Sequence, residues 1–384
     1  MISRRVAIVG FGVAHYGAIS PEISYKEMMY EACTKAYEMA GIDPRKDVQS
    51  FVSCSEDFNE GTSIFDEYIP DQMGAMLRST HTIAGDGIHG VCAGVMQILT
   101  GRFDVVVVEA HSKASNLSNH IGLIHFAQDP AFMRSLSAHP YVLAGLEMRS
   151  FLESTATSEE QCAQVVVKNK NNALFNPMGA RSSKVSIEQV LSSPPTFEPL
   201  KKLEESQPAD AGFCLVLAGE EVVKSLGVEP IWITGIGWCN DSYQPERRNG
   251  IGAEYARLSA QMAYKMAGIT QPKKAIDVAE IDDSFSYKEL QHLEALGLTR
   301  KGEAGVLLQE GALNIDGELP TNPSGGSLGC GNFLDANGLF RIIQVAKQLK
   351  GEAVGYQVKS AKTGLAMSWR GIPTASGAVC ILEV

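Results

Sequence analysis

The chain has 384 residues, of which 45% are hydrophobic and 20% charged, and a formal net charge of −11 at pH 7. This length exceeds one ordinary small domain, so two core-forming units are expected. The acidic balance argues against nucleic acid or an anionic membrane surface as the main partner. The eight cysteines are scattered without a CxxC pair, which favours buried free thiols over a disulfide framework or a metal cluster. With neither a signal-peptide pattern nor an apolar run of transmembrane length, we expect a cytoplasmic, enzyme-like protein.

The first 113 residues alternate buried strands with helices. A helix is predicted to end near Gly41, a typical C-terminal stop, and the VVVV run after Asp104 predicts a fully buried strand. The expected elements are a strand with a glycine turn at 4–17, a helix at 24–42, a strand at 48–57, an apolar stretch with a turn and helix at 80–101, and a strand at 102–113.

The segment 114–205 differs from its surroundings. It contains proline-marked breaks and polar loops, and a Ser/Glu capping pattern opens a predicted helix at 157–177. We interpret it as an inserted loop domain, after which 211–221 returns as a strand. The predicted division is an N-terminal half at 1–113 plus 206–222, the insert at 114–205, and a C-terminal half at 223–384.

An internal repeat relates the two halves. IWITGIG at 231–237 resembles VAIVGFG at 6–12, and AYKMAGI at 263–269 resembles AYEMAGI at 36–42. A third pair, LKGEAVGYQVK and LTGRFDVVVVE, follows in the same order. Three matches in one order predict two βαβαβ halves, with helices on both faces of a mixed sheet.

The most conspicuous stretch is the glycine-rich run NPSGGSLGCGNFLDANG at 322–338, which is followed at once by helical spacing. Few Cβ atoms let a backbone approach a ligand, and a helix starting at the end of the run would aim free N–H groups into it. That arrangement suits an anion or a developing oxyanion, and a tight surface turn is the alternative. The repeat places its counterpart near Ala84, so the two turns are expected to face one pocket.

These segments together resemble the thiolase superfamily. DVAEIDDSFSYKEL at 277–290 resembles the family's E-I-H-D-A-F segment, and the glycine-rich run resembles N-P-x-G-G followed by G-H-P-L-G-A-T-G. SQPADAGFCLVLAGEE resembles the S-D-G-A-A-A strand, and the helix at 157–177 resembles archaeal and sterol-carrier-protein-type thiolases. The resemblance covers nearly the whole chain. It implies an α/β thiolase fold, with duplicated βαβαβ halves forming a five-layer αβαβα core and an inserted loop domain.

Four positions that carry catalytic side chains in that family hold other residues here. The nucleophilic Cys falls on Ala84, the two His positions fall on Asp282 and Asn332, and the second Cys falls near Ser368. Asn332 can donate an N–H to a thioester oxygen but cannot shuttle a proton. Asp282 is either a base, with its pKa raised by the neighbouring Asp283, or a hydrogen-bond acceptor for the local backbone.

Several other residues are candidates for the same chemistry. Cys330 is the best replacement nucleophile by position, and a small buried thiol is the alternative. Cys92 and His89 are more typical of a core, and Tyr287 does not stand where thiolase-like aldolases have tyrosines. We expect catalysis from Asn332, Cys330, Asp282 and Ser368, and contacts to the coenzyme A ester from Ala84, Gly325, Gly326, Ser327 and Asp86. Four basic residues of the inserted segment either contact the phosphates of coenzyme A or form a solvated basic face: Lys168, Lys170, Arg181 and Lys184.

The resemblance implies a carbon–carbon bond reaction on an acyl-coenzyme A. Retro-Claisen thiolysis of a 3-oxoacyl ester is the first hypothesis, with benzoylsuccinyl-CoA as one candidate substrate. A retro-aldolase acting on a 3-hydroxyacyl ester needs no nucleophilic Cys, and a non-catalytic acyl-CoA-binding subunit would tolerate all four replacements. The resemblance further implies coenzyme A as a substrate, no permanently bound cofactor or metal, a homodimeric core and a small zinc-ribbon/OB-fold partner subunit.

Overall fold

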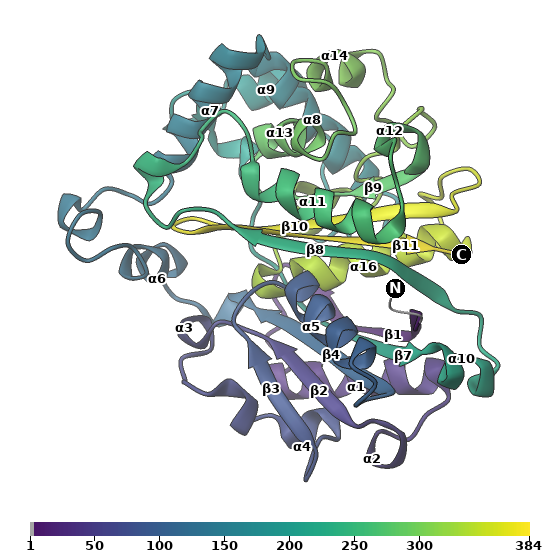
Figure 1. Ribbon diagram of the computed structural model, residues 1–384. Helices are drawn as coiled ribbons and strands as arrows, with labels where there is room; N and C mark the ends of the chain where they lie inside the picture. Colours follow the sequence, from purple (N-terminus) through teal and green to yellow (C-terminus); the bar gives the residue numbers. More distant parts are fainter. Residues whose placement is uncertain (1–3) are drawn as a thin grey trace.

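The computed structural model describes residues 4–384, which fold into two stacked halves with a helical region on one side (Figure 1). Nine strands form one hydrogen-bonded series in the order β3-β2-β4-β7-β1-β8-β11-β10-β9. The first half contributes β1 (Val6–Gly17), β2 (Ser50–Cys54), β3 (Ser79–Ile83), β4 (Val105–Lys113) and β7 (Asp210–Gly219). The second half contributes β8 (Ile231–Asn240), β9 (Val278–Glu280), β10 (Thr363–Gly371) and β11 (Ala375–Glu383).

Both halves have the same strand topology, which confirms the predicted duplication. In the first half β2 and β4 are parallel, whereas β4–β7 and β7–β1 are antiparallel. In the second half β9 and β10 are parallel, whereas β10–β11 and β11–β8 are antiparallel. The counterpart of β3 is reduced to a parallel bridge between Ala279 and Thr321. The halves meet where β1 and β8 pair antiparallel between Val6–Ile8 and Ile231–Ile233.

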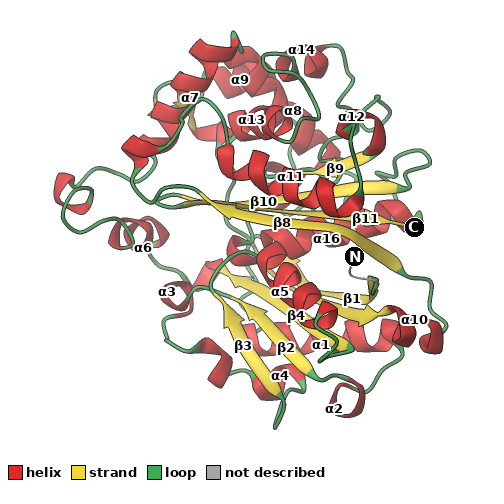
Figure 2. Cartoon of the chain, in the orientation of Figure 1, coloured by secondary structure: helices red, strands yellow, loops and turns green. Residues whose placement is uncertain are grey.

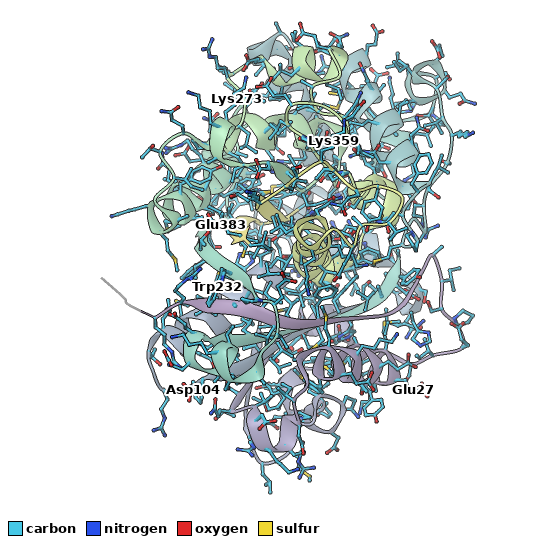
Figure 3. All side chains as sticks on the ribbon, turned by 90° about the vertical axis from the view of Figure 1, so that its right-hand side faces the viewer. Glu27, Asp104, Trp232, Lys273, Lys359 and Glu383 are labelled. Atoms are coloured by element: carbon cyan, nitrogen blue, oxygen red, sulfur yellow. The ribbon has the colours of Figure 1, made fainter. Side chains whose placement is uncertain are left out.

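Helices enclose each half and fill the space between them (Figure 2). Helix α1 (Tyr25–Ala40) covers the outer face of the first half, and α11 (Glu254–Ala267) covers the second. Helices α5 (Gly87–Leu99) and α16 (Asn337–Lys350) lie between the two sheet halves. The result is the five-layer αβαβα arrangement. Figure 3 shows it from the side, with Glu27 and Asp104 in the first half and Lys273 and Lys359 in the second.

The repeated glycines explain why the outer helices pack so closely. A Cβ added at Gly10 would lie 2.4 Å from the carbonyl oxygen of Ala36 on α1. The equivalent Cβ at Gly235 would lie 2.3 Å from the carbonyl oxygen of Ala263 on α11. Only a residue without a Cβ allows this approach of strand and helix. The repeated motif (V/I)xIxGxG therefore encodes the same strand–helix contact twice.

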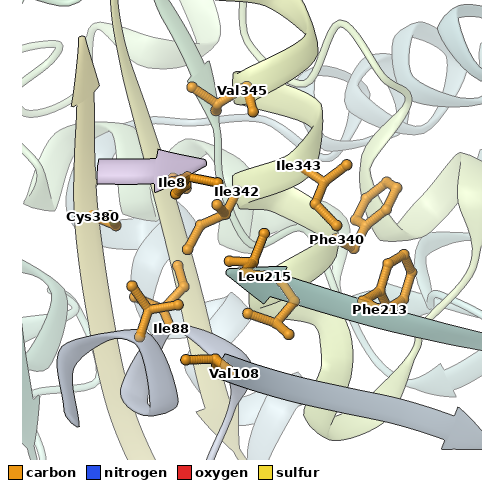
Figure 4. Packing of buried hydrophobic residues seen from close by; sticks show 14 of the residues in the cluster. Ile8, Ile88, Val108, Phe213, Leu215, Phe340, Ile342, Ile343, Val345 and Cys380 are labelled. Carbon is orange, nitrogen blue, oxygen red and sulfur yellow. The ribbon is translucent and has the colours of Figure 1, made fainter. Parts of the chain in front are cut away.

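The central helices pack against each other at their first turns. A Cβ at Gly87 would lie 2.6 Å from the backbone nitrogen of Leu339, so α16 touches the α5 backbone. Around them, buried side chains of both halves form one core, in which Ile88 and Val108 face Leu215 and Ile342 (Figure 4). Apolar burial on this scale is the main stabilising contribution to the fold.

The segment 114–205 adds no strand to the nine-stranded series. It forms α6 (His120–Phe126), α7 (Val142–Thr155), α8 (Glu159–Ala173), α9 (Ile187–Leu191) and a two-stranded ribbon of β5 (Pro195–Phe197) and β6 (Leu200–Lys201). Ser158 and Gln161, rather than a Ser/Glu pair, form the capping box of α8. Helix α8 packs on α13 (Ser286–Ala295) and α14 (Ala304–Gln309), so this segment shares a hydrophobic core with the second half.

The remaining helices are short. Helix α15 (Gly326–Cys330) lies inside the glycine-rich run, where the sequence predicted only a loop, and α16 follows as predicted. The others are α2 (Pro44–Asp47), α3 (Asp57–Glu60), α4 (Pro70–Met73), α10 (Glu220–Leu226) and α12 (Pro272–Ala275). Within residues 4–384, no helix combines the length and apolarity needed to cross a membrane.

Candidate active site

A cleft of about 250 Å³ opens where the N-termini of α5 and α16 meet the end of β10. We call it the active-site cleft. Side chains from both halves and from the inserted segment contribute to it, as expected for a pocket at the junction of the duplicated halves. Its walls are Glu56, Phe58, Asn59, Asp86, His120, Ile124, Ala127, Tyr141, Ser206, Ser284, Phe285, Asn332, Leu334, Asn337 and residues 369–374.

Asp86 lies at the centre of this arrangement because it is the N-cap of α5. Its Oδ1 accepts a hydrogen bond from the backbone N–H of Ile88 at 3.1 Å, and Oδ2 accepts one from Gly338 of α16 at 2.9 Å. One carboxyl group therefore joins the first turns of both central helices. Burial raises the pKa of Asp86 to about 6, and the Ser368 hydroxyl and the Arg341 guanidinium oppose the increase only in part.

Asn332 lines the cleft opposite, just after α15. Its Oδ1 accepts hydrogen bonds from the Asn337 amide at 2.8 Å and from the backbone N–H of Leu334 at 3.0 Å, which fixes the orientation of the amide. Its Nδ2 donates to the Ser206 hydroxyl at 3.2 Å. A primary amide has two N–H donors, so one remains for a ligand.

Arg370 provides the positive charge of the cleft. Its Nε donates to Oε1 of Glu56 at 2.8 Å, and Nη1 lies 2.9 Å from Oδ1 of Asp335. Burial alone would lower the pKa of Arg370, but the carboxylates of Asp335 and Glu56 outweigh it and raise that pKa. A guanidinium has five N–H donors, and these ion pairs leave some of them free to meet a substrate oxygen.

Two further groups with acid–base character line the cleft and were not predicted from the sequence. Burial lowers the pKa of His120, the first residue of α6, so its imidazole is neutral at pH 7. Burial also raises the pKa of Tyr141 to about 12, which keeps its hydroxyl protonated. Both come from the inserted segment, whose sequence has no motif that would mark them. Only the fold brings them to the cleft.

The first part of the glycine-rich run, residues 322–331, lies outside the cleft, whereas Asn332, Leu334 and Asn337 near its C-terminal end line it. The Asp283 carboxylate accepts the backbone N–H groups of Ser327 at 2.6 Å and Leu328 at 3.1 Å, at the start of α15. The anion site expected here is therefore filled by a side chain of the protein itself. Gly325, Gly326 and Ser327 are fully buried and do not line the cleft.

Asp282 is likewise buried outside the cleft. Its Oδ2 pairs with Nη2 of Arg341 at 2.8 Å, and its Oδ1 accepts the backbone N–H of Ser284 at 3.0 Å. Arg341 is fully buried as well, and its Nη2 also donates to the Ser327 hydroxyl at 2.8 Å. The ion pair joins α16 to the segment after β9, and the hydrogen bond to Ser327 joins α16 to the glycine-rich run, so the geometry gives Asp282 a structural partner.

Cys330 is fully buried and does not line the cleft. Its Sγ lies 3.2 Å from the carbonyl oxygen of Ser324 and 3.5 Å from Nδ2 of Asn176. Burial, together with the carboxylates of Glu280 and Asp283, raises the pKa of Cys330 well above its usual range. The group is therefore a thiol at neutral pH, whereas a nucleophile must be a thiolate.

The other predicted residues are dispersed. Ser368 is buried beneath the cleft, and Ala84 is exposed at the end of β3 outside it. Tyr287 donates to Glu147 at 2.8 Å, and burial raises the pKa of Cys92 to about 12 and lowers that of His89 to about 4.

Of the four basic residues proposed for phosphates, Lys184 is exposed. The other three bind protein groups: Lys168 pairs with Glu289, Lys170 donates to Leu328 and Arg181 to Pro208.

Comparison with known proteins agrees with this architecture. The family model described as "Thiolase C-terminal domain-like" matches residues 237–384. The acetyl-CoA acetyltransferase of Methanocaldococcus jannaschii is 30% identical over 361 residues, which are 90% of this chain and 90% of that protein. The benzoylsuccinyl-CoA thiolase subunit BbsB of Thauera aromatica is 27% identical over 375 residues, 93% of this chain and 92% of the relative.

A solved structure shows the same fold over nearly the entire chain. The Ltp2-ChsH2(DUF35) aldolase superposes with a TM-score of 0.84 at 23% identity, covering 99% of this chain and 98% of that one. Two observations identify the family. The sequence similarity to the archaeal acetyltransferase extends over 90% of this chain, and the core is a duplicated five-layer arrangement. The chain belongs to the thiolase superfamily.

Proposed function

We propose that this protein cleaves or forms the C2–C3 bond of the acyl group in an acyl-coenzyme A. The reaction uses acid–base chemistry and has no acyl-cysteine intermediate. The observation that carries the proposal is the composition of the active-site cleft. A carboxyl group with a pKa of about 6, that of Asp86, lines it, and no cysteine of residues 4–384 does. A base with a pKa close to the working pH is well suited to proton transfer.

In the cleavage direction the substrate is a 3-hydroxyacyl-CoA. The Asp86 carboxylate removes the proton of the 3-hydroxyl group, the C2–C3 bond breaks, and C3 becomes a carbonyl carbon. The electron pair moves onto the thioester as an enolate, which is then protonated at C2 by the carboxylic acid of Asp86. The products are an aldehyde or ketone and a shortened acyl-CoA.

Two groups of the cleft are suited to the enolate oxygen. The free N–H of the Asn332 amide and the guanidinium of Arg370 both line the cleft and are held by neighbours before any ligand arrives. Fixed donors directed at developing charge contribute more than mobile ones, because they need not reorganise during the reaction. Neutral His120 and the Tyr141 hydroxyl are available to the departing carbonyl compound.

Thiolysis is the second candidate, and the names of the archaeal relatives favour it. The acetyl-CoA acetyltransferases of Methanocaldococcus jannaschii and Methanothermobacter thermautotrophicus align over 90% and 94% of this chain. In such a reaction Asp86 would deprotonate the thiol of free coenzyme A, which would then attack the 3-oxo carbonyl directly. Thiolysis and aldol cleavage would thus use the same base, but only thiolysis needs free coenzyme A.

Omission of free coenzyme A separates these reactions. Purified protein is incubated with a panel of 3-hydroxyacyl-CoA and 3-oxoacyl-CoA esters, with and without free coenzyme A, and the products are identified by mass spectrometry. We expect cleavage of a 3-hydroxyacyl ester in the absence of free coenzyme A. Turnover of 3-oxoacyl esters only when free coenzyme A is present would establish thiolysis instead. Binding of esters without any product would identify a non-catalytic subunit.

The assembly expected for this function is a homodimer that works with a small zinc-ribbon/OB-fold subunit. The edge strand β3 supports the first part, because its outer backbone groups have no partner strand in the nine-stranded series described. Exposed apolar side chains around α6, namely Phe126, Phe132 and Leu136, are available to a partner. Coenzyme A enters as part of the ester substrate, and no resident cofactor takes part in the proposed steps.

A further inference from the structure

A second cleft of about 610 Å³ lies beside the active-site cleft. Helix α7, the connection between β8 and α11, and the loop after β10 form its walls. Apolar side chains dominate these walls, with Val142, Leu143 and Leu146 on α7 and Ile372 opposite. Ligand pockets usually span roughly 300–1,000 Å³, so this space is large enough for a bulky molecular group.

The two clefts share walls. Trp369 and Ile372 line both of them, so the spaces meet along these two side chains. Trp369 is held in place from two sides, with its ring stacked 6.5 Å from Tyr255 and edge-on 6.2 Å from Phe285. A group that reaches past this indole from the thioester position would enter the second cleft.

The floor of the second cleft is charged but electrically compensated. The ammonium group of buried Lys288 lies 2.8 Å from Oε1 of Glu147, 2.9 Å from Oε1 of Gln291 and 3.1 Å from the Tyr255 hydroxyl. Its three N–H donors are therefore used, and Glu147 neutralises its charge. Such a floor does not select an anion. The walls favour an apolar ligand by burial of apolar surface.

One polar group at the junction is unsatisfied. Trp369 is 8% exposed, and its Nε1–H has no acceptor among the described residues. A buried donor without a partner is unfavourable, and a ligand that accepts its hydrogen bond removes that cost. The junction thus has a place for one hydrogen-bond acceptor on an otherwise apolar ligand.

We infer that the second cleft binds the distal part of the substrate's acyl group, and that the substrate is therefore a coenzyme A ester with a bulky, mainly apolar acyl chain or ring system. This inference rests on the proposed function, because it assumes a thioester in the active-site cleft. It extends that function by naming the substrate class. An acetyl or acetoacetyl group would leave the second cleft empty.

Calorimetric titration with unreactive esters tests the inference. Acetyl-CoA, octanoyl-CoA and 2-naphthoyl-CoA are titrated into the wild-type protein and into Val142→Trp, which fills the second cleft from α7. We expect 2-naphthoyl-CoA to bind the wild type at least tenfold more tightly than acetyl-CoA. In Val142→Trp that preference disappears, whereas the affinity for acetyl-CoA changes less than twofold.

Two further variants make the test specific. Val354→Trp is the matched control, because Val354 is 80% exposed and lines neither cleft, and it should bind all three esters like the wild type. Gly252→Phe narrows the second cleft from the other wall and replaces Val142→Trp if the latter fails to fold. A Cβ at Gly252 has only Asn249 Nδ2 nearby, at 3.7 Å, so this substitution introduces no backbone strain.

The outcomes distinguish a failure of the acyl-group inference from a failure of the proposed function. Equal affinity of the wild type for all three esters, or an unchanged preference in both filling variants, would overturn the acyl-group inference and leave the cleft to another occupant such as a partner segment. In that case the proposed acid–base function would stand. Failure of every ester to bind would instead refute the proposed function, and the inference with it.

Discussion

Three aspartates near the central helices show how the environment of a carboxyl group decides its role. Asp282 pairs with a buried arginine, and Asp283 accepts the backbone N–H groups of α15. Asp86 also accepts two backbone N–H groups, but it lines an open cleft, and burial leaves its pKa near 6. Of the three, only Asp86 can exchange a proton with a ligand in that cleft.

Cys330 leads to a second testable statement about a single residue. Its thiol is buried, and its pKa is held well above the usual range, so it cannot supply a thiolate to the cleft. Replacement by serine keeps a donor for the Ser324 carbonyl oxygen. We expect Cys330→Ser to retain kcat/KM within about threefold, measured on whichever ester the wild type cleaves. A loss of a hundredfold or more, without a loss of folded protein, would restore Cys330 as a catalytic candidate.

At the scale of an element, residues 322–331 of the glycine-rich run are a structural support for the cleft, and only the part of the run from Asn332 onward contributes to its wall. Gly326 has a φ of +57°, and a Cβ there would lie 2.2 Å from Oδ2 of Asp283. An alanine at this position would therefore strain the backbone and displace the carboxylate that holds the first turn of α15. Left-handed backbone costs a non-glycine residue roughly 1–2 kcal/mol, and loss of buried hydrogen bonds adds roughly 1–3 kcal/mol.

Gly326→Ala should accordingly lower the free energy of unfolding by about 2–4 kcal/mol, measured as the shift of the urea midpoint. Gly250→Ala is the matched control, since the nearest atom to its added Cβ is Ser150 Oγ at 3.5 Å. The control should change stability by less than about 1 kcal/mol, as surface substitutions usually do. Similar stabilities for the two variants would show that the Asp283 contact is not required.

At the scale of the whole molecule, the duplication was predictable and the cleft was not. The repeat (V/I)xIxGxG with AYxMAGI encodes a strand and the helix that packs on its glycines, so local sequence determines this contact in both halves. The predicted core helices and strands are confirmed with small differences at their ends. Because the pattern recurs in order, it predicted two βαβαβ halves, and the resemblance to thiolases added the expectation of a five-layer core.

The residues around the cleft were harder to predict because they come from distant parts of the chain. Asp86 and Asn332 were found through their motifs, and both line the cleft. His120 and Tyr141 belong to the inserted segment and have no motif. Cys330 and Asp282 lie close to Asn332 and Ser284 in sequence, but their side chains are buried outside the cleft. Spacing in sequence does not determine which neighbour faces a ligand.

Asp86→Asn most directly tests the central claim that this carboxyl group is the base. Asparagine caps a helix about as well as aspartate, so α5 should keep its first turn. Because Asp86 must be ionised to accept a proton, wild-type kcat/KM should fall as the pH drops through about 6. We expect Asp86→Asn to bind acyl-CoA normally and to lose roughly 10²–10⁴-fold in kcat. Its kcat/KM should no longer fall as the pH drops through about 6. Full activity of Asp86→Asn with an unchanged pH profile would contradict it.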